Sequence, residues 1–464
     1  MPFTNLDLRI AIVGAGPSGF YAAEALQKAV PAVRIDLFDR LPTPFGLVRG
    51  GVAPDHPKIK SVTRVFERIA AHPGFRFVGH VRVGTDVTPA ELRSHYDAVI
   101  YAVGAETDRP LGIPGESLPG CHAATELVGW YNGHPDYRDA TFDLDVEAAA
   151  VVGLGNVAMD VTRILARPAH DLDRTDIADH AVRALGQSRL RTIHVLGRRG
   201  PVQSSFTTPE LRELGELADV AVEVDPADLE LDPTSAAYLA ESGDRNAEKN
   251  LEVLREWASR PPRDAARRIV FHFGVSPVAV LGTDHVEAIR VVHNTLEPDG
   301  KGSVRAVASG RTEEIPVGLV FRSVGYRGIP IAGLPFDEDR GLLPNTEGRV
   351  VEHVGSHTSL DGIYACGWIK RGPTGVIGTN KVCATQTVDR LLADVVAGRV
   401  TPGPGSPDAL LASLAARGTR IVPWSAWQRI DAAEVTRGEA AGKPRDKFTR
   451  INELLQAAGK DASG

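Results

Sequence analysis

Two glycine-rich turns, each preceded by a short apolar run and followed by a helical stretch, constrain the fold of this chain most strongly. The first turn occupies residues 14–19, after the apolar run 10–13 and before a second apolar run at 33–38. The second turn occupies residues 153–158, and the apolar run after its helix lies at 192–196. The order strand, glycine turn, helix, strand is typical of a doubly wound parallel sheet. We therefore predict an α/β protein with two doubly wound, Rossmann-like nucleotide-binding domains.

The first turn has the glycine spacing of a dinucleotide site. Gly14, Gly16 and Gly19 let the backbone turn tightly, approach a pyrophosphate and pack the helix on the strand. Asp39 ends the next predicted strand, where a carboxylate can accept hydrogen bonds from a ribose 2'-hydroxyl. The pattern predicts a bound dinucleotide. The alternative is a turn kept for packing, with Asp39 as a cap at the strand end.

The second turn differs where its strand ends. Gly153 and Gly155 keep the pattern and Ala158 takes the third position, but Arg198 and Arg199 stand where the ribose acid would be. Guanidiniums offer bidentate, charge-assisted contacts to a 2'-phosphate, so this turn predicts NADP(H). The alternative is an exposed arginine pair on a solvated turn. Because only one site suits a phosphorylated ribose, we expect the other dinucleotide to be FAD, and hydride exchange between NADPH and flavin follows.

The positions of the other strands suggest a split first domain. A buried strand at residues 97–103 precedes a Pro/Gly-rich stretch, which places a domain crossing near residue 105. We expect residues 1–105 and 325–464 to form a discontinuous FAD-binding domain, and residues 106–324 to form the NADP-binding domain.

We also predict helices and strands for the rest of the second domain and for the region after it. Residues 211–268 are charged and helical in pattern. A meander inserted in the second domain is expected from strands at residues 269–280, 285–293 and 303–308. Two later apolar runs, 319–324 and 362–367, are expected to return to the first sheet.

Composition restricts the partners and the compartment. The 464 residues carry 52 basic and 59 acidic side chains, a net charge of -7, so no global positive field exists to hold nucleic acid. Cys121, Cys366 and Cys383 are too scattered for a disulfide framework, which favours a reducing cytoplasm. The first nine residues lack the features of a secretory signal, and no apolar run approaches the roughly 20 residues of a membrane span, so we expect no membrane insertion.

Several longer runs carry a specific resemblance. They are PFGLVR at 44–49, GVAPDHPK at 51–58, GLGNVAMD at 153–160, GRRGP at 197–201 and GWIKRGPTGVIG at 367–378. The chain resembles the adrenodoxin reductase family, including its mycobacterial NADPH-ferredoxin reductases, over nearly its whole length, with the tail GKPR at 442–445 included. The resemblance implies an enzyme that transfers a hydride from NADPH to FAD and then single electrons to an iron-sulfur ferredoxin.

The resemblance also implies site residues. The FAD site would be lined by Ser18, Asp39, Leu47, Val83, Trp368, Gly375, Val376 and Ile377. NADP would be contacted by Leu154, Gly155, Asn156, Val157, Arg198, Arg199 and Glu210, with Gly375 at the nicotinamide and Arg109 as in the mycobacterial members. Ser18 stands where some members have Ala, and Asp39 where they have Glu. Both differences preserve the small or acidic character of the position.

Three polar residues are implied near the nicotinamide, namely His56, Asp160 and Glu210. Hydride transfer needs proximity more than acid or base catalysis, so we assign them to positioning and proton supply. Each has an ordinary alternative: a satisfied loop histidine, a polar residue in the turn after the phosphate loop and, for Glu210, a capping box with Thr207. Likewise Trp368 could be core, and the turn at 372–375 could be a plain helix entry rather than a set of N–H groups facing a reduced flavin.

Other classes of flavoprotein are less compatible with the cysteines. A flavin disulfide reductase needs a redox Cys-x-x-Cys pair, and the three isolated cysteines cannot supply it; a flavin monooxygenase has a partner motif that is missing here. The alternatives kept open are an FAD/NADPH electron-relay subunit of a larger complex and another flavin-dependent NADPH oxidoreductase. Relay subunits of the glutamate synthase type carry cysteine clusters for iron-sulfur centres, which three isolated cysteines do not provide.

Overall fold

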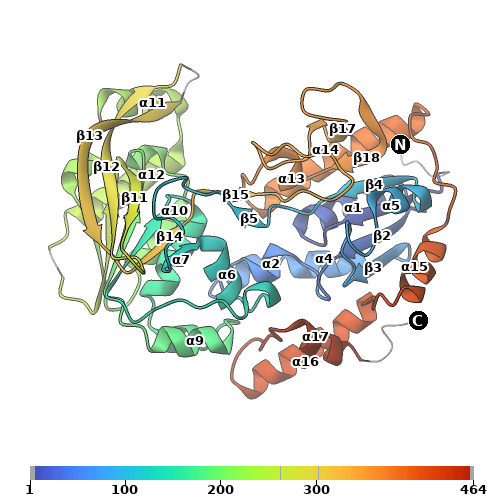
Figure 1. The fold of residues 1–464 in the computed structure, drawn as a ribbon, viewed down its shortest axis with the longest axis horizontal. Helices are drawn as coiled ribbons and strands as arrows, with labels where there is room; N and C mark the ends of the chain where they lie inside the picture. The colour runs from blue at the N-terminus through green and yellow to red at the C-terminus, as the bar shows by residue number, and fades with distance from the viewer. Residues whose placement is uncertain (1–5, 262, 301–302, 460–464) are drawn as a thin grey trace. The chain divides into compact units, whose positions relative to one another are not determined.

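The computed structural model describes residues 6–261, 263–300 and 303–459, and it divides into two compact units (Figure 1). Unit 1 contains residues 1–107, 132–138 and 326–464, and unit 2 contains residues 108–131 and 139–325. The chain therefore crosses at 107/108 and 325/326, where the sequence predicts 105/106 and 324/325. The grouping of residues 132–138 with unit 1 is not expected from the sequence, and the predicted domain ends at residues 1–5 and 460–464 lie outside the described residues.

Unit 1 is built on a seven-stranded sheet in the order β16-β17-β18-β4-β1-β2-β3. Its parallel strands are β1 (Arg9–Val13), β2 (Arg34–Asp39), β3 (Phe75–Gly79), β4 (Ala98–Tyr101) and β18 (Ser359–Ala365), and its antiparallel edge is β16 (Asn345–Thr346) and β17 (Arg349–Val351). Its helices are α1 (Pro17–Ala29), α2 (Leu47–Gly50), α3 (Pro57–Lys60), α4 (Thr63–Ala70), α5 (Pro89–His95), α13 (Trp368–Arg371), α14 (Ile377–Val396), α15 (Pro407–Ala416), α16 (Trp424–Ala440) and α17 (Ile451–Ala458). The return of the 362–367 run to this sheet is confirmed, because β18 pairs with β4.

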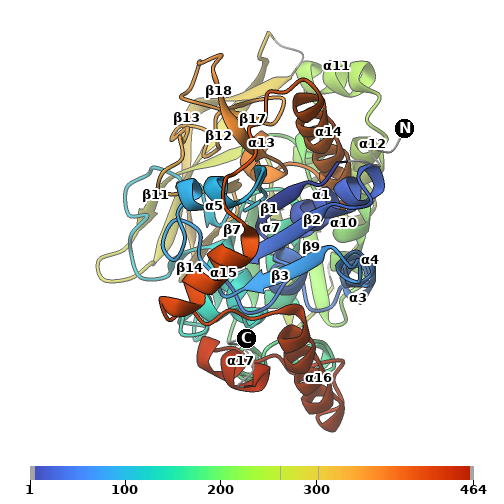
Figure 2. The same cartoon turned by 90° about the vertical axis from the view of Figure 1, so that its right-hand side faces the viewer.

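Burial on both faces explains the apolar strands of this sheet. Ile10 and Ile12 of β1 face the core under α1 and α14, whereas Ala11 and Val13 face the opposite core. Helices α1 and α14 pack against each other, as Figure 2 shows. The first glycine turn thus lies between a buried strand and a buried helix, at the carboxyl end of the strand, where ligands bind in doubly wound sheets.

The C-terminal segment packs on the β3 edge of the same sheet. The amide of Gly79 donates to the carbonyl of Val422 at 2.9 Å, and Trp424 at the start of α16 contacts the rings of Phe75 and Phe77. The tail is therefore part of the unit 1 core and not an appendage.

Polar contacts along its length tie the segment 132–138 into unit 1. The carbonyl of Asn132 accepts from Lys447 Nζ at 3.1 Å, Asp136 forms an ion pair with Arg40 at 2.8 Å, and Arg138 Nε donates to Thr449 Oγ1 at 3.1 Å. This short segment belongs to unit 1 although the flanking residues on both sides belong to unit 2.

Unit 2 has a parallel six-stranded sheet in the order β6-β14-β7-β8-β10-β9 and an antiparallel sheet β11-β12-β13. The strands are β6 (Cys121–Ala123), β7 (Ala148–Val152), β8 (Thr192–Leu196), β9 (Val220–Val224), β10 (Arg267–His272), β11 (Val275–Leu281), β12 (Ala288–Pro298), β13 (Val304–Pro316) and β14 (Leu319–Arg322). The helices are α6 (Ala124–Tyr131), α7 (Asn156–Ala166), α8 (Ala169–Leu172), α9 (Asp179–Gly186), α10 (Thr208–Gly215), α11 (Pro233–Ser242) and α12 (Arg245–Ala258). A two-stranded ribbon of β5 (Thr107–Asp108) and β15 (Tyr326–Arg327) forms where the chain passes between the units at 107/108 and 325/326.

Three predictions about these strands are wrong. The 319–324 run does not return to the first sheet, because β14 pairs in parallel with β7 and β6 of unit 2. The run at 269–280 is two strands, since Gly274 adopts a φ of +64° and separates β10, in the parallel sheet, from β11, in the meander. The helical stretch 211–268 also contains β9. A continuous apolar run indicates a buried strand but not which parallel sheet it joins.

Among the described residues, no helix is long and apolar enough to cross a bilayer. Within the same ranges, no group of three or more His, Cys, Asp or Glu side chains is arranged to hold a metal ion.

Candidate cofactor sites

The three glycines of the first turn are required for three different reasons. Gly14 has a φ of +109°, and a Cβ there would lie 2.5 Å from the carbonyl oxygen of Ala102. A Cβ on Gly19 would lie 2.0 Å from the carbonyl oxygen of Gly14, so this glycine permits close packing of α1 on the turn. Gly16, in contrast, has nothing within 4 Å of its Cβ position and precedes α1 without a side-chain cap. An open, uncapped helix start of this kind can serve as a cradle for a pyrophosphate.

Asp39 connects the end of β2 to the turn. Its Oδ2 accepts from the amide of Ala15 and its Oδ1 from the amide of Leu41, both at 2.9 Å. Burial raises the pKa of this carboxyl to about 6, although the two amides and Arg40 act in the opposite direction. Each oxygen keeps a further lone pair, so the carboxylate can cap the strand and also accept from a ribose hydroxyl.

The segment 45–47 lies against this turn. The amide of Phe45 donates to the carbonyl of Ala15 at 2.7 Å, and a Cβ on Gly46 would lie 2.9 Å from the Cα of Gly16. The next residue, Leu47, leaves 39% of its surface exposed, which is unusual for a leucine in this core-rich unit. An exposed apolar side chain beside a phosphate cradle suits the ring system of a flavin.

Trp368 is brought to the same turn by a close approach at the start of α13. A Cβ on Gly367 would lie 2.0 Å from Oγ of Ser18, so α13 lies directly against the first turn of α1. The indole Nε1 of Trp368 is buried, yet it has no hydrogen-bond partner within the described residues. A buried N–H without a partner is costly, and a ligand carbonyl would satisfy it.

The turn before α14 presents an exposed helix start. Gly375 has a φ of +80°, and the amide of Val376 donates to Oγ1 of Thr379 at 3.2 Å. Val376 is 58% exposed, and Ile377 begins a 20-residue helix without a side-chain cap. Arg371 fixes the turn by donating to the carbonyl of Thr374 and to Asn380 Oδ1. Val83, the remaining lining residue implied by the resemblance, is half-buried beside an isolated bridge to Val87.

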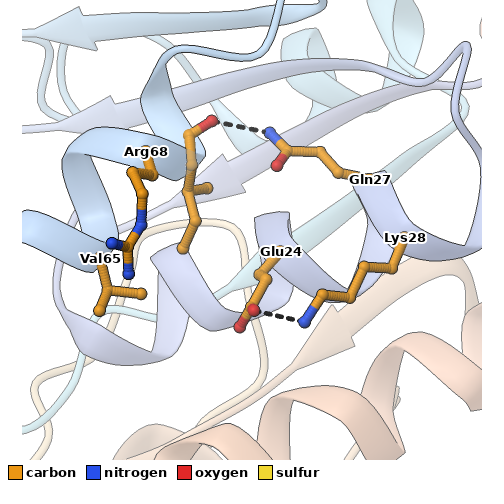
Figure 3. A pocket seen from close by; sticks show the side chains of 6 residues that line it. Glu24, Gln27, Lys28, Val65 and Arg68 are labelled. Atoms are coloured by element: carbon orange, nitrogen blue, oxygen red, sulfur yellow. Dashed lines mark hydrogen bonds and ion pairs between the residues drawn. The ribbon is translucent and has the colours of Figure 1, made fainter.

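A separate surface pocket lies between α1 and α4 (Figure 3). It is lined by Glu24, Gln27, Lys28, Val65, Arg68 and Ile69. Gln27 donates to the carbonyl of Ile69 at 3.0 Å, and Lys28 pairs with Glu24. These residues lie further along α1 than the glycine turn, so this pocket is not the cradle described above.

The second turn repeats the geometry of the first. Gly153 has a φ of +138°, and a Cβ there would lie 2.2 Å from the carbonyl oxygen of Ser323. Gly155 has only Oγ of Ser205 near its Cβ position, at 3.5 Å, so its surroundings are open. Ala158 is fully buried in α7, and its methyl group is accommodated.

The residues that follow the glycines of the second turn pack against the end of β8 and the start of α10. Leu154 packs closely on Gly197: a Cβ on Gly197 would lie 2.2 Å from Leu154 Cδ1. Asn156 Oδ1 accepts from the amide of Thr207 at 2.8 Å, which places the start of α10 over the turn. Val157, next in α7, is half-buried.

Arg198 and Arg199 follow β8 at the carboxyl end of the sheet. Arg198 is exposed, and Arg199 donates to the carbonyls of Val304 and Gln203 at 3.3 and 3.4 Å. Burial and the neighbouring Arg198 lower the pKa of Arg199. In the part of the chain that the structure describes, neither guanidinium forms an ion pair with a carboxylate, and the contacts of Arg199 are to neutral carbonyls, so both positive charges are available to an anionic ligand.

Comparison with known proteins agrees with two nucleotide sites of this kind. Residues 8–191 match the pyridine nucleotide-disulphide oxidoreductase family. The chain is 48% identical to NADPH-ferredoxin reductase FprA of Mycobacterium leprae, over 96% of this chain and 97% of that protein. It is 41% identical to the mitochondrial NADPH:adrenodoxin oxidoreductase of Arabidopsis thaliana, over 98% and 96%. This chain belongs to the NADPH-ferredoxin reductase family.

A solved structure of this family gives the same result. Mycobacterium tuberculosis FprA in complex with NADPH superposes with a TM-score of 0.91 at 47% identity, covering 98% of this chain and 100% of that chain. The family consists of oxidoreductases that use FAD and NADPH. The resemblance stated from the sequence motifs is confirmed.

The polar residues implied near the nicotinamide have distinct surroundings. Glu210 accepts from the hydroxyl of Thr207, but Thr207 does not cap α10 in return, so the reciprocal capping box is not formed. Asp160 lies within α7, not in the turn, and forms an ion pair with Arg163 at 2.8 Å. His56 precedes α3 and gives it no side-chain cap. Arg109 is exposed, and its amide donates to the carbonyl of Gly325 at 2.9 Å.

These residues are distributed between the units. His56 belongs to unit 1 together with the first turn, whereas Arg109, Asp160 and Glu210 belong to unit 2 together with the second. Their joint action at one nicotinamide is therefore part of the proposal below.

Sequence reasoning missed two buried charged groups in this family member. Arg163 is 1% exposed and joins Asp160 of α7 to Glu213 of α10. Glu434 is fully buried and pairs with Arg49 and Arg445. Arg49 and Arg445 lie inside the PFGLVR and GKPR runs, so these motifs were the available signal, but nothing in the sequence pairs them with Glu434.

Proposed function

We propose that this protein is an NADPH-ferredoxin oxidoreductase, which takes a hydride from NADPH and delivers single electrons to an iron-sulfur ferredoxin. The observation that carries the proposal is the contrast between the two turns: one ends in Asp39, and the other ends in two arginines without a carboxylate partner among the described residues. When bound, FAD supplies the link between a two-electron donor and a one-electron acceptor.

In this proposal unit 1 holds FAD. The pyrophosphate lies at Gly14, Gly16, Ser18 and Gly19, and Asp39 accepts from the ribose. The ring system is contacted by Leu47, Val83, Trp368, Gly375, Val376 and Ile377. The open Gly16, the exposed Leu47 and the unsatisfied Trp368 Nε1 support this assignment.

Unit 2 holds NADP in the same proposal. The residues of the turn, Gly153, Leu154, Gly155, Asn156 and Val157, cradle its pyrophosphate, and Arg198 and Arg199 bind the 2'-phosphate. Arg109 and Glu210 complete the site within unit 2, and Gly375 of unit 1 is proposed to lie at the nicotinamide. His56, Asp160 and Glu210 position the nicotinamide and supply protons, because hydride transfer depends chiefly on proximity and orientation.

The cysteines do not favour a disulfide reductase. Burial raises the pKa of Cys121 to about 11 and also raises that of Cys366, so neither thiol is a ready nucleophile. A location in a reducing cytoplasm remains a prediction from the cysteine pattern. The relatives' names imply an iron-sulfur partner, and we propose a ferredoxin.

The test is reduction of cytochrome c by NADPH with and without an added ferredoxin. We expect the purified protein to show a flavin spectrum, to be bleached by anaerobic NADPH, and to reduce cytochrome c much faster when ferredoxin is present. A rate that does not depend on ferredoxin contradicts this proposal and favours a different flavin-dependent NADPH oxidoreductase. A protein active only when joined to further subunits favours the relay alternative.

A further inference from the structure

We propose that Glu434, in the C-terminal helix α16, is a positioning residue for the flavin site, acting through Arg49 on residues 45–51. The inference rests on the proposed function insofar as it places FAD at the first glycine turn. All the residues concerned belong to unit 1.

The Glu434 carboxylate is fully buried, and both of its oxygens are occupied. Oε2 accepts from Arg49 Nη1 at 2.8 Å and from Arg445 Nη1 at 2.9 Å. Oε1 accepts from Arg49 Nη2 at 2.5 Å and from the amide of Phe448 at 3.0 Å. Burial alone would raise the pKa of this carboxyl, but the two guanidiniums outweigh it and lower the pKa. Glu434 is therefore ionised and holds Arg49 by a bidentate pair.

The segment that Arg49 anchors is strained. Phe45 has a φ of +84°, a conformation that a bulky residue adopts only when its surroundings impose it, and Gly46 follows with a φ of +48°. Phe45 is 5% exposed, and its ring meets the ring of Trp427 edge-on at 5.7 Å. Because Trp427 and Glu434 lie on the same helix, α16 holds this segment at two points, Phe45 and Arg49.

The same segment reaches the glycine turn. Phe45 donates to the carbonyl of Ala15, Gly46 lies against Gly16, and Leu47 exposes its apolar side chain beside them. Arg49 is two residues beyond Leu47, with its guanidinium 5.3 Å from the centre of the Trp427 ring. A loss of the Glu434 pair thus frees the part of the segment that carries the proposed flavin contact.

A tight turn after α16 completes the arrangement. Gly438 approaches the tail so closely that a Cβ there would lie 2.4 Å from the Cα of Arg445. Arg445 also pairs with Asp431 at 2.7 Å, and Lys447 donates to the carbonyl of Arg49 at 3.4 Å. This gives the GKPR run a role: its turn places Arg445 as the second cation on Glu434.

The experiment compares Glu434→Gln with Glu439→Gln, an exposed glutamate on the same helix. In Glu434→Gln we expect the FAD dissociation constant to rise about tenfold or more, which corresponds to losing one charge-assisted hydrogen bond. With saturating FAD, stopped-flow reduction by NADPH should be slower while the KM for NADPH is unchanged. Glu439→Gln should match the wild type in both measurements.

A merely structural role has a different signature. If Glu434→Gln has a lower Tm but an FAD dissociation constant and a reduction rate within about twofold of the wild type, the inference is wrong. If Glu434→Gln does not fold, Arg49→Lys decides by the same criteria, because it keeps the charge and removes the bidentate geometry. A wild type that binds no FAD refutes the proposed function, whereas a wild type and variant that bind FAD equally well refute only the role of Glu434.

Discussion

The two glycine turns use the same backbone geometry and opposite side-chain chemistry. In both, the first glycine adopts a positive φ under a neighbouring carbonyl, and the second has no atom closer than 3.5 Å to its Cβ position. The strand ends differ: Asp39 is bonded to two backbone amides, whereas Arg198 is exposed. The comparison teaches that one backbone geometry, suited to a pyrophosphate, can be combined with different side chains at the end of the following strand, and it is these side chains that we propose distinguish the two riboses.

The third position of the glycine pattern differs between the two turns: it is Gly19 in the first and Ala158 in the second. A methyl group at residue 19 would meet the carbonyl of Gly14 at 2.0 Å, yet Ala158 carries a methyl group at the matching place in α7 without exposure. Helix α1 therefore approaches its turn more closely than α7 does. The third glycine is a packing requirement set by each helix, and it carries no information about the ligand.

The largest effect is expected from matched substitutions of the first glycines. Gly14→Ala should abolish stable FAD binding, because it adds a positive-φ strain of about 1–3 kcal/mol and a clash with the Ala102 carbonyl. Gly153→Ala should leave the flavin spectrum intact and remove NADPH-dependent bleaching. Flavin content after gel filtration and anaerobic titration measure the two results. Loss of FAD in both variants would break the assignment of one ligand to each turn.

The next effect concerns the arginines. Replacing both Arg198 and Arg199 with Ala should raise the KM for NADPH by at least about 100-fold, because each arginine can contribute a charge-assisted hydrogen bond of about 1.5–3 kcal/mol. The KM for NADH should change little. Steady-state ferricyanide reduction with each nucleotide provides the measurement. Equal changes for NADPH and NADH would contradict recognition of the 2'-phosphate.

A smaller effect is expected for Asp39→Asn, where FAD affinity should fall about tenfold through loss of an ionised acceptor.

The same substitution should also change how the stability of the protein depends on pH. Because the folded protein raises the pKa of Asp39 from 3.8 to about 6, ionisation disfavours the folded state as pH rises through that window. Relative to wild type, the variant without FAD should gain up to roughly 3 kcal/mol of unfolding free energy between pH 4 and 7.

Urea unfolding of FAD-depleted protein at several pH values tests this difference. A constant difference across the range would mean that Asp39 has an ordinary pKa in the folded protein. No matching pH signature is expected for Arg198→Ala, since an arginine does not titrate in this range.

The sequence predicted these turns well because glycine spacing and strand ends are local. Gly14, Gly16, Gly19 and Asp39 lie within 26 residues, and their roles depend on backbone geometry that a glycine pattern reports directly. Arg198 and Arg199 follow the end of β8, as the sequence predicted, while their contact with NADP stays a prediction.

Long-range pairing was not predictable in the same way. The apolar run of β14 suits either parallel sheet, and its partners β6 and β7 are selected by packing. The Thr207 and Glu210 spacing suggested a capping box, but Asn156 takes the amide of Thr207 instead. The pair formed by Arg49 and Glu434 joins residues 385 positions apart, and no local pattern reports such a contact.

Residues 132–138 have a consequence for recombination between family members. A segment exchanged between 107/108 and 325/326 looks like a complete module. It also replaces residues 132–138, which contain the partners of Arg40, Lys447 and Thr449 in unit 1. A chimaera made with that segment has a foreign segment packed against unit 1 of its recipient. An exchange limited to residues 108–131 and 139–325 leaves the recipient's own residues 132–138 in place. Such an exchange follows the boundaries between the two units.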